Sequence, residues 1–293
     1  MESVDLTDMP EIPEQLAEEL KKKDIDDYKI ISVNAAKGRY NLLASKKDGS
    51  SLFIKYNDVD AAGWNSFQKE KGIYRFLKGE TSIPTVMYDE EDILAMEYFE
   101  DSCTLREWLL NRENAKEFSC LIRSTLEKYR AFLAKMSEYP EEMGTLKADN
   151  ELSSFLAKLL LSGPYGSKVY KAERFRNRCL YHLFRWIYAS RIKLTDNAYA
   201  IHGDFHLNNI LVNDGEAYMI DLENVVRGNA AAELAYCYVQ IWVLIHKNRE
   251  LLDILEREIR SIFDIEMIDE GEFNTIIKLY QKAILCNRRF HKQ

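Results

Sequence analysis

Cysteine is scarce in this 293-residue sequence, and the cysteines it contains are widely separated. They are Cys103, Cys120, Cys179, Cys237 and Cys286. No CxxC pair and no cluster of cysteine with histidine occurs, so the sequence favours neither a structural zinc site nor a disulfide framework. An odd number of scattered cysteines is typical of a reducing compartment, and we therefore expect a cytoplasmic protein.

Long hydrophobic runs are also absent. The most apolar stretch, 231–245 (AAELAYCYVQIWVLI), includes Glu233 and is shorter than the roughly 20 residues that a membrane-spanning helix needs. The first residues, MESVDLTDMPEIPEQ, are acidic and have no apolar core, so we expect no signal peptide. The sequence thus predicts no membrane partner, and we expect 231–245 to form a buried helix.

Clustered positive charge is a third absence. The chain has 40 Lys and Arg against 48 Asp and Glu, a net charge of −8, which argues against a nucleic-acid partner. Such a charge is compatible with a cationic substrate, and it is equally a simple route to solubility. Hydrophobic residues make up 46% and charged residues 30%, which is typical of a soluble protein with a real core. The length predicts one large or two closely packed domains.

The first hundred residues have mainly the pattern of β-strands. Apolar alternation predicts the order strand, strand, strand, helix, strand, strand after a short surface helix at 14–23. The Asp48-Gly49 pair favours a hairpin turn between the second and third strands. The expected strands are 28–33, 39–45, 51–56, 84–88 and 93–98, and the expected helix is 61–77. We therefore predict a small β-rich N-terminal lobe over residues 1–100.

The remaining residues have the pattern of long helices. Thr104 is a suitable N-cap for the helix TLREWLL, and further helices are expected at 114–138, 149–162, 168–192 and from about residue 230 onward. One hairpin interrupts them, because Asn213-Asp214-Gly215 separates two short strands. The predicted fold class is α+β, with residues 101–293 forming a larger, mainly helical lobe.

The segment Ile201–Asp221 carries the chemical signal. Its sequence is IHGDFHLNNILVNDGEAYMID. Phosphoryl transfer needs an acidic residue directed at the acceptor hydroxyl and hard oxygen ligands for Mg²⁺ on the nucleotide phosphates. Asp204 suits the first task, and Asn209 with Asp221 suits the second. The hairpin between Asn209 and Asp221 is a device for bringing Asp221 back beside the loop.

This motif resembles that of the aminoglycoside phosphotransferase and choline kinase family, whose members are related to eukaryotic protein kinases. The family signature is close to HGDxHxxN, followed by a short hairpin and ID(F/W)E, and this chain has HGDFHLNN at 202–209 and IDLE at 220–223. The resemblance implies a protein-kinase-like, two-lobed fold that binds ATP or GTP with Mg²⁺. It implies that Asp204 is the catalytic residue and that Asn209 and Asp221 are the metal ligands.

The N-terminal half contains two further residues that such a kinase requires, a strand lysine for the phosphates and a helix glutamate to position it. Lys55 lies in the apolar run LFIKY of the third strand, and Glu70 follows on the next helix. Taken alone, a solubilising lysine on an edge strand and a solvent-facing glutamate are the simpler interpretation. Together with the HGDxHxxN motif, they predict a functional Lys55–Glu70 pair.

The turn that would cover the phosphates is 34–39 (NAAKGR). It contains Gly38 but no GxGxxG pattern, so its glycine signal is weak by itself. The resemblance tolerates this and assigns Gly38 to the nucleotide site. Lys37 and Arg39 either touch phosphates or are exposed turn cations, and both interpretations stay open.

The segment 96–99 (MEYF) occupies the position of the linker whose backbone groups bind the purine in relatives, so the resemblance assigns Glu97 and Tyr98 to the nucleotide site. His202 is expected to be a packing or hydrogen-bonding residue. His206 either approaches the transferred phosphate or is a neutral, hydrogen-bonded histidine. Glu223 either orients a metal ligand or forms a helix cap or salt bridge.

The acceptor is expected to be a small molecule. Asp221 is followed after a few residues by a helix, with no Ala-Pro-Glu element of the kind that closes the substrate-docking segment of protein kinases. The resemblance suggests a hydroxyl of an aminoglycoside-, choline- or sugar-like acceptor. At 228–235 (GNAAAELA) the chain departs from the GDPxxDLA of relatives, with Glu233 in place of aspartate. Two alternatives remain: a nucleotide-binding pseudokinase that acts as a regulatory module, and an atypical protein kinase.

Overall fold

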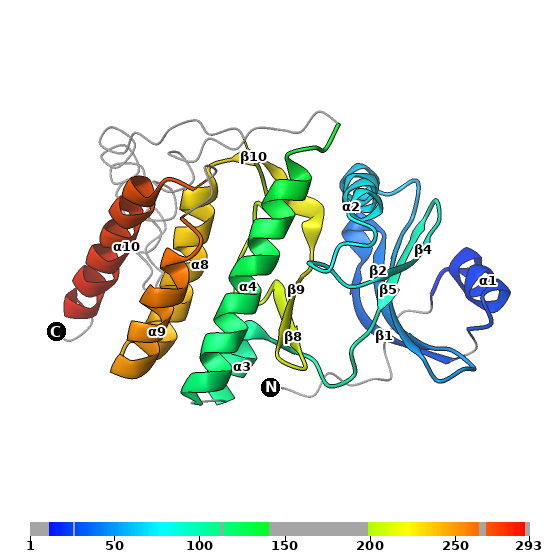
Figure 1. Ribbon diagram of the computed structural model, residues 1–293. Helices are drawn as coiled ribbons and strands as arrows, with labels where there is room; N and C mark the ends of the chain where they lie inside the picture. The colour runs from blue at the N-terminus through cyan, green and yellow to red at the C-terminus, as the bar shows by residue number, and fades with distance from the viewer. Residues whose placement is uncertain (1–11, 26, 112–113, 141–198, 264–267, 291–293) are drawn as a thin grey trace. The chain divides into compact units, whose positions relative to one another are not determined.

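A computed structural model of the chain describes residues 12–290, except 26, 112–113, 141–198 and 264–267. The chain divides into two compact units (Figure 1). The first unit consists of Met1–Ser102 together with Tyr218–Glu223, and the second consists of Cys103–Ala217 together with Asn224–Gln293. The short segment Tyr218–Glu223 therefore belongs to the first unit although it follows the long second stretch in sequence.

The first unit is built on a five-stranded sheet with the order β1-β2-β3-β5-β4, in which every neighbouring pair is antiparallel. Its strands are β1 (Asp27–Asn34), β2 (Arg39–Ser45), β3 (Ser51–Asn57), β4 (Val86–Asp89) and β5 (Ile93–Glu97). Its helices are α1 (Glu14–Lys22), the 3₁₀ turn η2 (Ala35–Lys37) and α2 (Trp64–Phe76). The five strands that the sequence predicted are all present, with ends that differ by no more than two residues.

Helices α1 and α2 lie on opposite faces of this sheet (Figure 1). Ile54 of β3 packs in a core cluster with Leu16 and Leu20 of α1. Neighbouring residues of a strand point to opposite faces, so Lys55 points away from α1. There its ammonium meets Glu70 of α2. The alternation of the strand thus places one charged residue on the α2 face while its neighbours build the core.

Helix α2 begins at Trp64, three residues later than predicted, and the reason lies in the turn before it. The backbone forms a tight turn at Ala61–Gly63, in which Trp64 N–H donates to Ala61 O at 3.0 Å. A Cβ at Gly63 would lie 2.6 Å from the carbonyl oxygen of Lys37, so the η2 turn packs directly against this corner. The corner uses residues that the apolar periodicity had assigned to the helix.

The second unit is mainly helical. Its described helices are α3 (Leu105–Asn111), α4 (Ala115–Met136), the 3₁₀ turn η3 (Leu222–Asn224, which starts in the first unit), α8 (Ala230–Ile245), α9 (Arg249–Arg260) and α10 (Glu270–Phe290). Helices α4, α9, α8 and α10 lie side by side (Figure 1). Three of these helices start after an asparagine whose side chain accepts a backbone N–H of the first turn. They are capped by Asn114, Asn229 and Asn248.

Short strands accompany these helices. They are β6 (Cys103–Thr104), β7 (Tyr199–Ile201), β8 (Ile210–Asn213), β9 (Glu216–Met219) and β10 (Val226–Gly228), arranged as β6-β8-β9 and β10-β7. Asp214 and Gly215 join β8 to β9 with φ values of +50° and +79°, as a two-residue type I′ turn requires. This hairpin, which the sequence predicted, leads the chain into the segment Tyr218–Glu223.

The α+β organisation predicted from the sequence is confirmed by the β-rich first unit and the mainly helical second unit. The helices predicted at 149–162 and 168–192 lie outside the described residues. Within the described residues, no helix is long and apolar enough to cross a membrane.

Candidate active site

In the first unit, Lys55 bridges two carboxylates. Its Nζ lies 2.6 Å from Oε1 of Glu70 and 3.0 Å from Oδ1 of Asp221. Lys55 is buried, the Glu70 side chain has no exposed surface, and the Asp221 side chain is 38% exposed. The structure therefore brings together three of the residues that the sequence predicted, and Asp221 is the member of the group that solvent can reach.

This arrangement keeps the lysine charged. Burial alone lowers the pKa of an ammonium group, but the negative charges of Glu70 and Asp221 outweigh burial and raise the pKa of Lys55 above its usual value. Buried charges of this kind are tolerated only when they are paired, and removal of one partner is strongly destabilising. Lys55 is thus a charged group held between two carboxylates.

Asp221 has an unusual backbone conformation, with φ at +64°. For a residue other than glycine, the left-handed region costs about 1–2 kcal/mol, so the neighbours must hold it there. Met219 N–H donates to Ser82 O at 2.8 Å, the Tyr218 ring packs on Phe99 at 4.7 Å, and Leu222 is fully buried. Contacts on both sides therefore fix the backbone that carries the Asp221 carboxylate.

Arg39 and Glu223 form a second charge pair in the first unit. Arg39 Nη1 lies 2.7 Å from Glu223 Oε2, and the same guanidinium donates to Ser66 Oγ at 3.2 Å and to Asn57 Oδ1 at 3.5 Å. Arg39 is buried, so the interpretation as an exposed turn cation is wrong. For Glu223, the structure supports the salt-bridge interpretation.

The η2 turn is shaped by Gly38, whose φ is +60°. A Cβ at this position would lie 2.3 Å from Cβ of Ala61, and Gly38 O accepts a hydrogen bond from Asp58 N–H at 2.9 Å. Glycine is therefore required both by the backbone angle and by the close approach of the turn before α2. Lys37, next to it, is exposed.

The predicted purine-binding residues Glu97 and Tyr98 lie at the end of β5. The N–H of Glu97 donates to Thr85 O at 2.9 Å, and the N–H of Tyr98 donates to Ser51 O at 3.2 Å. Both backbone donors are thus used within the protein. A purine bound at these two residues would have to use their carbonyl groups.

In the second unit, the loop between β7 and β8 holds the HGDxHxxN residues. Asn209 is buried, and its Nδ2 donates to Asp204 O at 3.0 Å and to Asp204 Oδ2 at 3.3 Å. His206 Nε2 lies 3.5 Å from the same Asp204 Oδ2. The Asp204 side chain is 39% exposed. The structure therefore brings Asp204 and Asn209 together, with Asp204 open to solvent.

Gly203 gives this loop its sharp bend, with φ at +80°. A Cβ here would lie 1.9 Å from the carbonyl oxygen of Asn224, so any side chain would push the two backbone segments apart. His202 before it is fully buried, accepts the N–H of Asp204 at 3.3 Å on Nδ1, and packs near Phe205. This arrangement agrees with the expected packing and hydrogen-bonding role of His202.

Glu233 of α8 anchors the same loop. It accepts hydrogen bonds from His202 N–H at 3.0 Å, from Gly203 N–H at 2.6 Å and from the Tyr129 hydroxyl at 2.8 Å. Burial raises the pKa of Glu233 to about 7, against the lowering effect of these three donors, and the charge of Asp204 adds to the rise. The sequence pattern gave Glu233 no functional role. Its signal was a carboxylate within an otherwise apolar helix.

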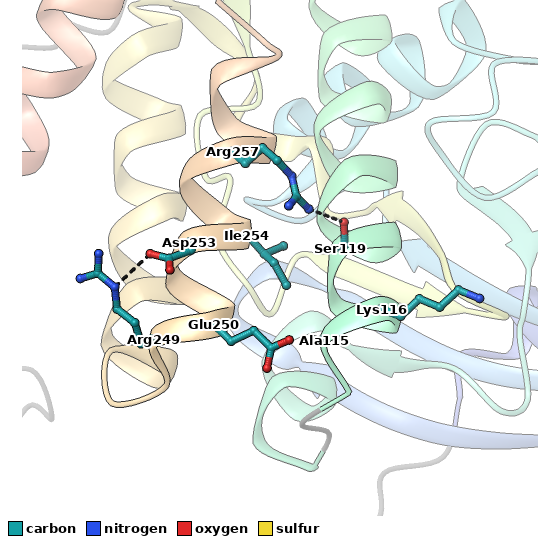
Figure 2. A pocket seen from close by; sticks show the side chains of 8 residues that line it. All are labelled: Ala115, Lys116, Ser119, Arg249, Glu250, Asp253, Ile254 and Arg257. Atoms are coloured by element: carbon teal, nitrogen blue, oxygen red, sulfur yellow. Dashed lines mark hydrogen bonds and ion pairs between the residues drawn. The ribbon is translucent and has the colours of Figure 1, made fainter.

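A depression on the surface of the second unit lies between α4 and α9 (Figure 2). It is lined by Ala115, Lys116, Ser119, Arg249, Glu250, Asp253, Ile254 and Arg257. Most of these side chains are charged, and Arg249 is already paired with Asp253 at 3.0 Å. None of the motif residues lines this depression, so we do not place the active site there.

The predicted metal ligands have suitable chemistry. Since Nδ2 of Asn209 donates to Asp204, the amide of Asn209 is oriented so that its oxygen is the atom left to bind a cation. Asp221 supplies a partly exposed carboxylate. Oxygen atoms of this kind are the ligands that Mg²⁺ prefers. No group of three or more His, Cys, Asp or Glu side chains suited to a metal occurs among the described residues.

Comparison with known proteins gives the chain a family. Residues 65–266 match the model of the phosphotransferase enzyme family. The aminoglycoside phosphotransferase APH(2'')-Ib in its ADP-bound form is 14% identical, with 94% of this chain and 99% of that one covered and a TM-score of 0.52. APH(3'')-Id from Streptomyces rimosus is 15% identical, with 92% of this chain and 97% of that one covered and a TM-score of 0.54. The AMP-bound spectinomycin phosphotransferase APH(9)-Ia is 14% identical, with 95% of this chain and 88% of that one covered and a TM-score of 0.56.

The search of curated proteins finds no significant match. The similarity to the solved structures shows the fold, and it confirms the predicted protein-kinase-like fold class. The family model covers well over half of the sequence and confirms the resemblance inferred from the HGDxHxxN motif. The chain belongs to the phosphotransferase enzyme family.

Proposed function

We propose that this protein is a small-molecule kinase that transfers the γ-phosphate of ATP or GTP to a hydroxyl group of a small polar acceptor. The observation that carries the proposal is the buried Lys55 held between Glu70 and the partly exposed Asp221. A cation fixed in this way is suited to binding nucleotide phosphates. A purely structural ion pair between Lys55 and Glu70 would not need the exposed Asp221. Membership of the phosphotransferase family supports the same reaction class.

Lys55 is assigned to the phosphates of the nucleotide, and Glu70 keeps the lysine in position. Gly38 lets the turn after β1 approach the nucleotide, and the carbonyl groups of Glu97 and Tyr98 face the purine. In this assignment the lobe formed by residues 1–100 binds the nucleotide, and residues 101–293 supply the catalytic loop and the acceptor site.

Asp204 is assigned as the residue that orients the acceptor hydroxyl and accepts its proton. Its Oδ2 is held by Asn209, which leaves the carboxylate oriented but still partly exposed. His206 Nε2 lies 3.5 Å from the same oxygen, Asp204 Oδ2. Fixing these groups before the substrate arrives is how such an enzyme lowers the barrier.

Asn209 and Asp221 are assigned as the residues that would hold Mg²⁺. When bound, Mg²⁺ neutralises charge on the phosphates. Because Asp221 also pairs with Lys55, its carboxylate would serve both the lysine and the metal. Lys55 remains paired with Glu70 whichever partner Asp221 takes.

The acceptor is proposed to be small, polar and, in view of the net charge of −8, cationic. Similar folds have been solved with gentamicin, with streptomycin and ATP, and with spectinomycin and ADP. These ligands are polyhydroxylated and carry amino groups. They define the first compounds to test, with choline-like alcohols and simple sugars as the second group.

The test is release of ADP or GDP with Mg²⁺ across that panel, with transfer of phosphate to the acceptor confirmed by mass spectrometry. Asp204→Asn should lower acceptor-dependent turnover roughly a thousandfold, because it removes the proton acceptor. Asp214→Asn is the matched control. Asp214 is exposed in the hairpin turn with φ at +50°, which asparagine tolerates, so its turnover should match that of the wild type.

Nucleotide binding without turnover on any acceptor, or turnover that is insensitive to Asp204→Asn, would contradict the proposal. The first result would favour a pseudokinase that acts as a regulatory module. Asp204-dependent incorporation of phosphate into protein, with none into small molecules, would instead favour an atypical protein kinase.

A further inference from the structure

The segment Tyr218–Glu223 carries the proposed metal ligand, and its end is fixed by charge. Glu223 accepts from Arg39 at 2.7 Å through its side chain, and its backbone carbonyl accepts from Lys69 Nζ at 3.4 Å. The Glu223 side chain is 19% exposed and that of Arg39 is 10% exposed. A pair this sheltered is less screened by salt than a surface pair, so it can hold the backbone more firmly.

Arg39 is itself rigid. It is the first residue of β2 and pairs in register with Asn57 at the end of β3. Its guanidinium spreads over three acceptors, Asn57 Oδ1 at 3.5 Å, Ser66 Oγ at 3.2 Å and Glu223 Oε2. The planar fork of an arginine suits such a fixed set of partners, whereas a lysine would satisfy only part of it. Glu223 is therefore tied to both the sheet and α2.

The strained residue lies two positions before this anchor. Asp221 keeps φ at +64°, and Met219, two positions on its other side, is fixed to Ser82. Loss of the Glu223 anchor would remove one of the contacts that hold the backbone at Asp221, so its carboxylate would be held less firmly in its present direction. Residues that support a metal ligand in this way typically change metal affinity about 10–100-fold when they are removed.

We propose that Arg39 and Glu223 form a positioning pair that holds Asp221 in its strained conformation for Mg²⁺-nucleotide, and that Arg39 does not itself bind the phosphates. The pair rests on the proposed function because that function assigns Mg²⁺ to Asp221. It settles the two roles that the sequence left open for Arg39 and Glu223 in favour of a single joint role.

The test is the affinity for ADP measured by calorimetry with EDTA and with Mg²⁺, which needs no turnover. Glu223→Gln and Arg39→Gln should each reduce the Mg²⁺-dependent gain in ADP affinity about tenfold. The affinity in EDTA should change less than about twofold, since the pair touches no phosphate in the proposal. The double variant Arg39→Glu/Glu223→Arg should regain part of the loss, because the ion pair is restored in the opposite direction while the hydrogen bonds that Arg39 donates to Asn57 and Ser66 are not.

Arg75→Gln is the matched control. Arg75 of α2 forms an ion pair with Asp89 through Nε at 2.5 Å and Nη2 at 3.0 Å, in the same unit but away from the segment Tyr218–Glu223. Its loss should leave the Mg²⁺-dependent gain unchanged. Glu223→Gln keeps the shape of the side chain and can still accept a hydrogen bond, so it keeps the test valid if Arg39→Gln fails to fold.

Three results would overturn the proposal. The first is an equal weakening of ADP binding in EDTA and in Mg²⁺, which would make Arg39 a phosphate ligand. The second is unchanged ADP binding in every variant, and the third is ADP binding by the wild type that does not respond to Mg²⁺. A wild type without turnover but with a Mg²⁺-dependent gain that the variants lose would refute the proposed kinase activity and support the positioning pair.

Discussion

The two units hold their proposed functional aspartates in different ways. In the first unit, the Asp221 carboxylate is paired with Lys55 at 3.0 Å, and Glu223, two residues later in the chain, is paired with Arg39. In the second unit, Asp204 lies on a loop whose backbone donates to the buried carboxylate of Glu233. Both aspartates are partly exposed, whereas Glu70 and Glu233 beside them are buried.

This difference separates two methods of positioning. A side-chain ion pair fixes one atom against another and fails when either partner is removed. A carboxylate that accepts two consecutive backbone N–H groups fixes the course of the chain itself, whatever side chains the loop carries. Side-chain ion pairs, as in the first unit, suit groups that bind a ligand whose number of phosphate charges varies. A carboxylate that accepts backbone N–H groups, as in the second unit, suits a loop that must keep one shape.

Loss of Lys55 should have the largest effect on stability. Lys55→Met leaves Glu70, which has no exposed surface, without its cation, and we expect a loss of about 3–5 kcal/mol in the free energy of unfolding. Urea denaturation measures this loss. Adding Glu70→Leu to the variant should recover most of it, because an apolar pair can replace a buried ion pair. Equal stability of Lys55→Met and of the double variant Lys55→Met/Glu70→Leu would show that Lys55 and Glu70 are not energetically coupled.

Loss of Glu233 should come second. Glu233→Ala removes the acceptor of two backbone N–H groups and of the Tyr129 hydroxyl, and we expect about 2–4 kcal/mol of destabilisation. Tyr129→Phe, which removes only one donor, should cost about 1 kcal/mol. The loss for Glu233→Ala should change little with salt concentration. A loss that fades in high salt would mean that the second unit also relies on charge pairing.

The bend at Gly203 offers a third test. Gly203→Ala meets both a positive φ and a contact of 1.9 Å with Asn224 O, so we expect about 2–4 kcal/mol of destabilisation and reduced turnover. Gly49→Ala is the matched variant, because Gly49 has φ at +85° with nothing within 4 Å of its Cβ position. It should lose only about 1 kcal/mol. Similar losses at the two positions would show that the close approach contributes nothing.

The pH dependence of stability offers a fourth test. Burial raises the pKa of Glu233 from its ordinary 4.5 to about 7 in the folded protein. The stabilising contribution of the protonated group is therefore full below pH 4.5 and is lost as the pH rises through about 7. The melting temperature of Glu233→Gln relative to the wild type should rise across this window. A difference that stays constant with pH would place the pKa of Glu233 outside it.

The sequence predicted the elements of the first unit well because their signals are local. Strand alternation around Lys55 and the Asp48-Gly49 turn depend on residues next to each other in the chain. The start of α2 was placed three residues early, since the packing of Gly63 against Lys37 O is invisible to helical periodicity. Asp204, Asn209 and Asp221 were found because their spacing is a recognisable motif, and their roles remain predictions for the experiments above.

Glu233 and Arg39 were assigned poorly from the sequence for the same physical reason. Glu233 meets His202, about 30 positions away, and Arg39 meets Glu223, 184 positions away. The residues next to a charged residue in the sequence do not indicate its partner. A buried, paired charge and an exposed charge therefore have the same local pattern. Only folding showed that Arg39 is buried and that its carboxylate partner lies next to the Asp221 backbone.

By itself, the sequence determined the five strands of the first unit, the fold class and the residue types available for phosphoryl transfer, because these follow from local periodicity and from one ordered motif. The tertiary structure decided which carboxylate each cation meets, which glycines lack room for a side chain, and which buried glutamate holds the loop that carries Asp204. Those features depend on contacts between distant segments, and their strength is set by burial, which exists only after the chain has folded.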